Sequence, residues 1–262
     1  MHFLMAINPL YSISGFAVGL LVGLTGVGGG ALMTPILVLL FGIHANTAVG
    51  TDLLYAAATK TVGTAVHGVS RTVDWRIVGR LAAGSIPATV LTLLVLAHVE
   101  KQLGAANHVI TIVLGMALIA TAVAILFRRI ILDYFEKRVG ALNPGRTVIF
   151  TVFLGAVLGI LVSLSSVGAG AIGVTVLLIL YPSLPAGKLV GSDIAHAVPL
   201  TLVAGIGHWL IGSVDIHLLL SLLTGSIPGI VVGSLIAARI PDHVLRPILA
   251  STLAIVGGRL IF

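Results

Sequence analysis

Apolar runs of about 20 residues follow one another along almost the whole chain, and this pattern constrains the fold more than any other feature. The hydrocarbon core of a bilayer is about 30 Å thick and a helix rises about 1.5 Å per residue, so such runs are typical of membrane-spanning helices. Only 8% of the 262 residues are charged, and the mean hydropathy is +1.20. We therefore expect one all-α integral membrane unit in the lipid bilayer, with no room for a soluble domain.

The charged residues gather at the ends of these runs, so the pI of about 10.2 does not indicate a nucleic-acid partner. The chain has no cysteine, which excludes disulfides and thiolate metal sites. The histidines lack metal-ligand spacing, and GVGGGA at 26–31 lacks the strand that a dinucleotide fingerprint needs. We expect no cofactor and no metal. MHFLMAINPL at the start lacks the basic flank of a signal peptide, which predicts that it belongs to the mature chain.

The sequence contains an internal repeat. Residues 19–37 match residues 159–177 at an offset of 140, and after one inserted residue near Pro182 further landmarks match at an offset of 141. These landmarks include Gly-Thr-Asp at 50–52 against Gly-Ser-Asp at 191–193, and the Gly-Ser-Ile-Pro runs at 84–87 and 225–228. We divide the chain into a first repeat over 1–127, a basic linker over 128–146 and a second repeat over 147–262.

Each repeat offers five apolar elements. We place them near 8–27, 29–43, 49–68, 76–98 and 107–127, and then near 147–166, 168–182, 189–212, 216–238 and 244–262. The second element of each repeat has only about 15 residues, or roughly 22 Å of helix, and follows a glycine-rich break, so it either crosses steeply or is re-entrant. The pattern predicts about 8–10 transmembrane or re-entrant helices.

The basic residues predict the orientation of the two repeats. The central linker carries five of them and is expected in the cytoplasm, together with the loop near Arg71 and Arg76. The equivalent loop of the second repeat, near Asp215, has no basic residue and is expected outside. The repeats are therefore predicted to be inverted, with broken helices near the midplane and a substrate site between them.

The two glycine-rich breaks are candidate anion sites, because a helix start leaves unpaired N–H donors and a partial positive charge. The residues concerned are Gly28, Gly29 and Gly30 in the first repeat and Ser165, Ser166, Gly168 and Gly170 in the second. The alternative is close helix packing, for which small residues are equally suited.

Charged residues inside apolar elements are the other candidates. Asp52 and Asp193 follow the hydroxyl residues Thr51 and Ser192, and their expected role is a substrate gate, a proton site or a helix cap. Lys60 lies about 16 Å along its helix from the cytoplasmic end and is expected to attract an anionic substrate. The alternative is a structural ion pair, for instance with Asp193.

Three histidines and one proline complete the candidates. His196 lies beside Pro199, which is expected to kink its helix and form a site wall or gate. An ordinary interior hydrogen bond is the alternative for His196. His67 and His208 match each other in the repeat and lie near the ends of their helices, where we expect an interfacial or gating role for both.

The duplicated segments TGVGGGALMTPIL with GTDLLYAAATKTVGTAVH, and SVGAGAIG with LPAGKLVGSDIAHAVPLTLVAGIGH, resemble the sulfite exporter TauE/SafE family. The resemblance spans nearly the whole chain. It implies a multi-pass permease of the cytoplasmic membrane for sulfur-containing anions such as sulfite, sulfoacetate or other organosulfonates. The family's motif positions carry over to the glycine turns, to Thr51 with Asp52, and to Ser192 with Asp193 and His196.

The residues and the resemblance together predict a secondary transporter, not an enzyme, that works by alternating access on a small anion. Protonation of Asp52, Asp193 or His196 is the expected coupling event. The alternatives are a permease for a carboxylate or a metal cation, and a passive anion channel. A homodimer is the oligomeric state considered.

Overall fold

The computed structural model describes residues 8–25, 30–69, 73–103, 106–139, 143–236 and 242–261. All regular secondary structure in these ranges is helical. The predicted all-α fold class is confirmed, and the apolar runs became helices because only internal backbone hydrogen bonding satisfies polar groups inside a bilayer.

The helices follow the predicted elements closely. The first repeat contains α1 (Pro9–Thr25), α2 (Gly30–Leu39), α3 (Ala45–Val69), α4 (Trp75–Leu103) and α5 (Ala106–Leu126). The second contains α7 (Pro144–Ser165), α8 (Ala171–Leu180), α9 (Ala186–Leu210), α10 (Ile216–Ile236) and α11 (Asp242–Ile261). The basic linker forms a further helix, α6 (Arg128–Val139), which the apolar pattern did not predict because its sequence is polar.

Five helices of the described ranges are long and apolar enough to cross a membrane, namely α4, α5, α7, α9 and α10. Large apolar side chains point outward along them, such as Leu91 and Phe153, each more than half exposed. Outward apolar side chains on apolar helices are typical of a lipid-facing surface.

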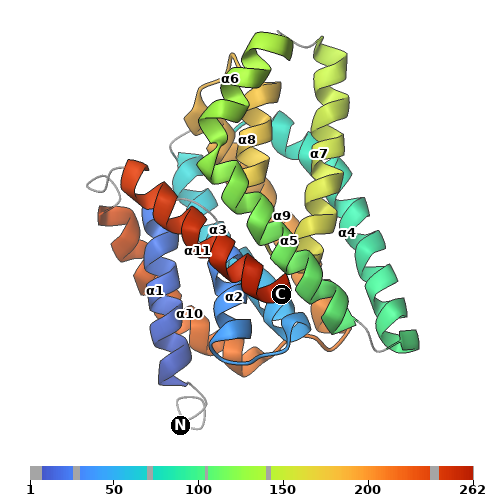
Figure 1. Cartoon of the computed structure of the whole chain (residues 1–262), viewed down its shortest axis with the longest axis vertical. Helices are drawn as coiled ribbons and strands as arrows, with labels where there is room; N and C mark the ends of the chain where they lie inside the picture. The colour runs from blue at the N-terminus through green and yellow to red at the C-terminus, as the bar shows by residue number, and fades with distance from the viewer. Residues whose placement is uncertain are drawn as a thin grey trace.

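The helices of one repeat pack on those of the other. In Figure 1, α1 lies beside α10 at one flank and α4 beside α7 at the other, while α11 crosses α5. The third helices of the two repeats, α3 and α9, also pack together. The first helix of each repeat therefore packs on the fourth helix of the other. This arrangement is consistent with two repeats related by an approximate two-fold axis.

The duplicated Gly-Ser-Ile-Pro runs explain how closely these helices approach. A Cβ atom at Gly84 of α4 would collide with the carbonyl oxygen of Val152 in α7, and one at Gly225 of α10 would collide with the carbonyl oxygen of Ser12 in α1. Both glycines occupy the same place in their repeat. Small residues allow such close backbone contact between membrane helices.

The second helix of each repeat is shorter than predicted. The helices α2 and α8 have 10 residues each, or about 15 Å, which is half the thickness of the hydrocarbon core. Before α8 the backbone turns through three left-handed residues, with φ of 57° at Ser166, 117° at Gly168 and 118° at Gly170. Glycine adopts such angles without steric cost, so the turn depends on it. Neither short helix crosses the bilayer by itself.

Candidate functional site

A group of buried ionisable side chains lies where α3 packs on α9. Asp52 and Lys60 come from α3, and Asp193 and His196 from α9, with exposed fractions of 0%, 8%, 1% and 0%. We call these four residues the central cluster. Ionisable groups are costly inside a membrane and usually face a polar interior or a pathway. The structure thus brings together the charged residues that the sequence had singled out separately.

Lys60 lies among the other members of the central cluster. It is near enough to Asp193, Asp52 and His196 for its charge to interact with all three. Among the described residues no carboxylate lies within the 4.0 Å of an ion pair with its amino group. Lys60 is therefore shared between two carboxylates, and the close ion pair with Asp193 that was the alternative is absent from this part of the chain.

Asp52 is hydrogen-bonded to the short helix α2 at Thr34, the fifth residue of that helix. Its Oδ2 atom accepts a hydrogen bond of 2.5 Å from the Thr34 hydroxyl, and the Thr34 backbone N–H also faces the carboxylate. The Ser166 hydroxyl lies near the same carboxylate, although in the described residues neither Ser166 Oγ nor Asp52 Oδ1 has a hydrogen-bond partner. One oxygen of a fully buried carboxylate is thus unpaired.

Asp193 has the corresponding position at the start of α8. The Gly170 backbone N–H faces its carboxylate, and a Cβ atom at Gly173 would collide with Asp193 Oδ1. That oxygen also lacks a partner within the described part of the chain. The helix start predicted to receive an anion therefore already faces a carboxylate of the protein, which complements the helix dipole.

His196 is anchored by a residue that the sequence argument overlooked. Its Nε2 atom lies 2.8 Å from the Ser85 hydroxyl of α4, while its Nδ1 has no partner in the described ranges. In the repeat, Tyr55 is equivalent to His196 and Ser226 is equivalent to Ser85. The Tyr55 and Ser226 hydroxyls face each other, but in the described residues neither oxygen has a partner in hydrogen-bonding geometry. Ser85 lies in a duplicated Gly-Ser-Ile-Pro run, and that duplication was the available signal.

Thr51 and Ser192, the hydroxyl residues that precede the two aspartates, bond to loops of the opposite repeat. Ser192 Oγ accepts a hydrogen bond of 2.8 Å from the Asp74 backbone N–H, and Thr51 Oγ1 accepts one of 3.0 Å from that of Asp215. These bonds link the two repeats beside the central cluster. Thr51 and Ser192 thus join loops to helices instead of pointing a free hydroxyl at the cluster.

The remaining glycine-turn candidates are only partly described. Gly28 and Gly29 lie outside the described residues, and Gly30 is the first residue of α2. The Ser165 hydroxyl bonds the Leu161 carbonyl oxygen at 2.6 Å, so its role is local to the end of α7. Gly168 and Gly170 supply the left-handed turn before α8.

The proposed gate residues lie along α3 and α9. Pro199 is inside α9 and half-buried. His208 is fully buried in the last turn of α9, and its Nε2 lies 2.9 Å from the Ser163 carbonyl oxygen. A pairing carbonyl in α7 makes that burial possible. The side chain of His67 lies outside the described residues. Within the described residues no three metal-ligating side chains come together.

The fold and the central cluster define a multi-pass membrane protein with a charged centre between two helical repeats. A family model described as sulfite exporter TauE/SafE matches residues 11–260, and the chain belongs to that family. It is 38% identical to the probable membrane transporter protein YjnA of Bacillus subtilis (strain 168), over 95% of this chain and 98% of the relative. It is 31% identical to the probable membrane transporter protein YdhB of the same organism, over 94% and 97%. No solved structure matched the chain significantly.

The predicted family, membrane location and class of protein are confirmed by these matches. The chain is a multi-pass membrane permease of the cell membrane. The names of the family and of the relatives describe transport, which agrees with the expectation that the chain is not an enzyme.

Proposed function

We propose that this permease is a secondary transporter for a small sulfur-containing anion, such as sulfite, sulfoacetate or another organosulfonate, by alternating access. The observation that carries the proposal is Lys60, a buried lysine where α3 packs on α9, two helices that come from different repeats. The family's description supplies the sulfur chemistry. A compact oxyanion head suits a lysine together with backbone N–H donors at helix starts.

The charge of the central cluster indicates how an anion would enter. With both carboxylates ionised and His196 neutral, the four residues carry a formal charge of −1, which repels an anion. Protonation of Asp52 or Asp193 removes that repulsion and frees the N–H donors of α2 or α8 for the substrate. We therefore propose that a proton accompanies the anion, with these two aspartates as the proton sites.

The same negative charge is the observation that favours a cation as the alternative substrate. Two buried carboxylates with unpaired oxygens resemble oxygen ligands of a hard cation. A cation would occupy the site beside Lys60 only against repulsion from that lysine. Competition by unlabelled sulfite, lactate and divalent cations against the labelled substrate separates the two classes.

The experiment is uptake of sulfite, sulfoacetate, sulfate and lactate into proteoliposomes that contain the purified full chain. Wild type is compared with Lys60→Met and with the control Lys101→Met, which removes an exposed lysine in the last turn of α4. We expect saturable uptake of a sulfur anion by wild type and Lys101→Met, and at least a tenfold loss in Lys60→Met, since a charged hydrogen bond contributes about 1.5–3 kcal/mol.

Two outcomes contradict the proposal. Equal uptake by a folded Lys60→Met would show that Lys60 does not attract the substrate. Flux that rises linearly with concentration and shows no counterflow would indicate a passive channel in place of a transporter.

A further inference from the structure

A cavity that shares no lining residue with the central cluster lies at the start of α7. It has a volume of about 500 Å³ and is bordered by α4, by the first turn of α7 and by the segment that joins α8 to α9. Its polar side chains are Arg80, Thr147, Tyr181 and Ser183. The volume is in the range of small-molecule sites, and is larger than a bare sulfate requires. We call it the Arg80 pocket.

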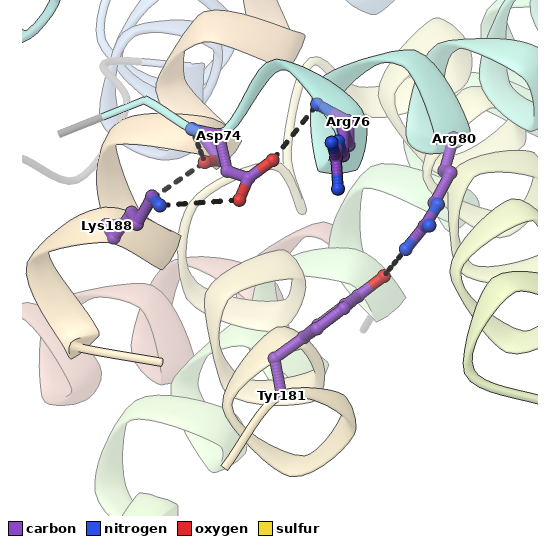
Figure 2. A network of polar contacts seen from close by, with 6 residues as sticks. Asp74, Arg76, Arg80, Tyr181 and Lys188 are labelled. Atoms are coloured by element: carbon purple, nitrogen blue, oxygen red, sulfur yellow. Dashed lines mark hydrogen bonds and ion pairs between the residues drawn. The ribbon is translucent and has the colours of Figure 1, made fainter. Parts of the chain in front are cut away.

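A chain of hydrogen bonds fixes Arg80 in this pocket. The Thr151 hydroxyl donates to the Thr147 carbonyl oxygen at 2.6 Å, so its oxygen is left to accept from the Tyr181 hydroxyl, 2.8 Å away. The Tyr181 oxygen in turn accepts from Arg80 Nη1 at 3.1 Å. Figure 2 shows Tyr181 reaching across to Arg80. The guanidinium is thus held by a neutral partner that leaves its charge uncompensated.

The charge balance of the pocket favours an anion. A guanidinium has five N–H donors, and the bond to Tyr181 uses one of them. No acidic residue lines the pocket, and among the described residues no carboxylate lies within ion-pair distance of Arg80. The nearby Asp74 is paired with Lys188 at 3.5 Å instead. The remaining donors of Arg80 match the two oxygens of a phosphate or sulfonate.

We propose that the Arg80 pocket binds an oxyanion head group, either a free sulfonate, sulfate or phosphate or the phosphodiester of an anionic lipid. Arg80 makes the bidentate contact, and the hydroxyls of Ser183 and Thr147 lie among the remaining lining groups. The site is separate from the central cluster and goes beyond the proposed transport function.

The test is equilibrium binding of inorganic sulfate and inorganic phosphate, by calorimetry, to the full chain in a neutral detergent. The chain carries Lys60→Met so that the lysine of the central cluster contributes nothing. Arg80→Gln is compared with Arg76→Gln, an exposed arginine of the same helix whose loss changes the net charge equally. We expect Arg80→Gln to weaken binding by roughly tenfold or more and Arg76→Gln by less than about twofold.

A parallel measurement identifies the source of the head group. The melting temperature is recorded in nanodiscs of phosphatidylcholine alone and with added phosphatidylglycerol. If soluble anions do not bind but phosphatidylglycerol stabilises wild type and not Arg80→Gln, the ligand is a lipid. Arg80→Lys keeps the positive charge and a donor for Tyr181, so it controls for misfolding. It should only partly weaken anion binding or the stabilisation by phosphatidylglycerol.

The proposal is overturned if neither soluble anions nor phosphatidylglycerol shows a dependence on Arg80. It is also overturned if Arg76→Gln has the same effect as Arg80→Gln, since the attraction would then be a general surface charge. Both of these outcomes leave the proposed anion transport through the central cluster untouched, because these experiments measure binding and stability and not uptake.

Discussion

The Ser192 hydroxyl accepts a hydrogen bond of 2.8 Å from the backbone N–H of Asp74, a residue 118 positions away in the other repeat. Thr51 and Asp215 make the equivalent bond of 3.0 Å. Asp74 and Asp215 approach the beginnings of α9 and α3 respectively, each next to an intramembrane aspartate. Within the described residues only the Asp74 side has an added ion pair, with Lys188 at 3.5 Å, because the residue equivalent to Lys188 in the first repeat is Thr47.

Replacing Ser192 by Ala should destabilise the protein by about 1 kcal/mol, because the Asp74 N–H loses its partner in a partly buried place. Ser192→Thr retains the hydroxyl, as Thr51 does in the other repeat, and should behave like wild type. Thermal unfolding in detergent measures both. Equal melting temperatures for all three proteins would mean that this bond contributes nothing to the contact between repeats.

Anion uptake should increase as the external pH falls. Protonation of Asp52 or Asp193 reduces the negative charge of the central cluster, and an anion is then repelled less. The Asp193→Asn variant has a side chain that is neutral at every pH. Anion uptake by this variant should therefore depend less steeply on pH than anion uptake by wild type. Initial rates of uptake between pH 5 and about 8 test this. An unchanged pH profile in the variant would exclude Asp193 as a proton site.

Ser85→Ala should reduce uptake and lower stability by about 1–3 kcal/mol, since it leaves the fully buried His196 without its hydrogen bond. The matched control is Ser226→Ala, which removes the equivalent hydroxyl in the other repeat, where no hydrogen bond of standard geometry is formed. Flux and thermal unfolding are measured on both. Similar effects of the two substitutions would show that the bond to His196 has no special role.

Gly173→Ala should impair folding or uptake, because the added methyl group would collide with the Asp193 carboxylate in front of α8. Gly79→Ala is the control, since a Cβ atom there meets nothing within 4 Å and alanine favours a helix. Yield of folded protein and initial uptake rates are compared. Normal uptake by Gly173→Ala would indicate that Asp193 can move away from the start of α8.

Much of the helical framework could be predicted from the sequence, because helix length in a bilayer depends on local hydrophobicity. The apolar runs located ten helices to within a few residues. The linker helix α6 was not predicted, since apolar runs identify only apolar helices and its sequence is polar. The length of α8 was overestimated, because the left-handed turn at 166–170 consumes residues that the apolar pattern counted as helix.

The candidate site was only partly predictable. Constant spacing in the repeat marked Asp52 and Asp193, and Lys60 stood out as a charge inside an apolar segment although its equivalent, Thr201, is neutral. Their partners come from other helices: Thr34 bonds Asp52 and Ser85 bonds His196. Nothing local distinguishes Thr34 from the many other hydroxyl residues in the chain, and Ser85 was marked only by its duplicated Gly-Ser-Ile-Pro run.

The sequence by itself determined that this chain is helical, lies in a membrane, is internally duplicated and places charges in apolar segments, since each follows from local composition or from comparing the chain with itself. Only the tertiary structure decided that α3 and α9 bring those charges together and that the short helices face Asp52 and Asp193. It also placed Arg80 in a pocket with a neutral partner. These relationships depend on packing between residues that are far apart in the chain, which hydrophobic periodicity does not encode.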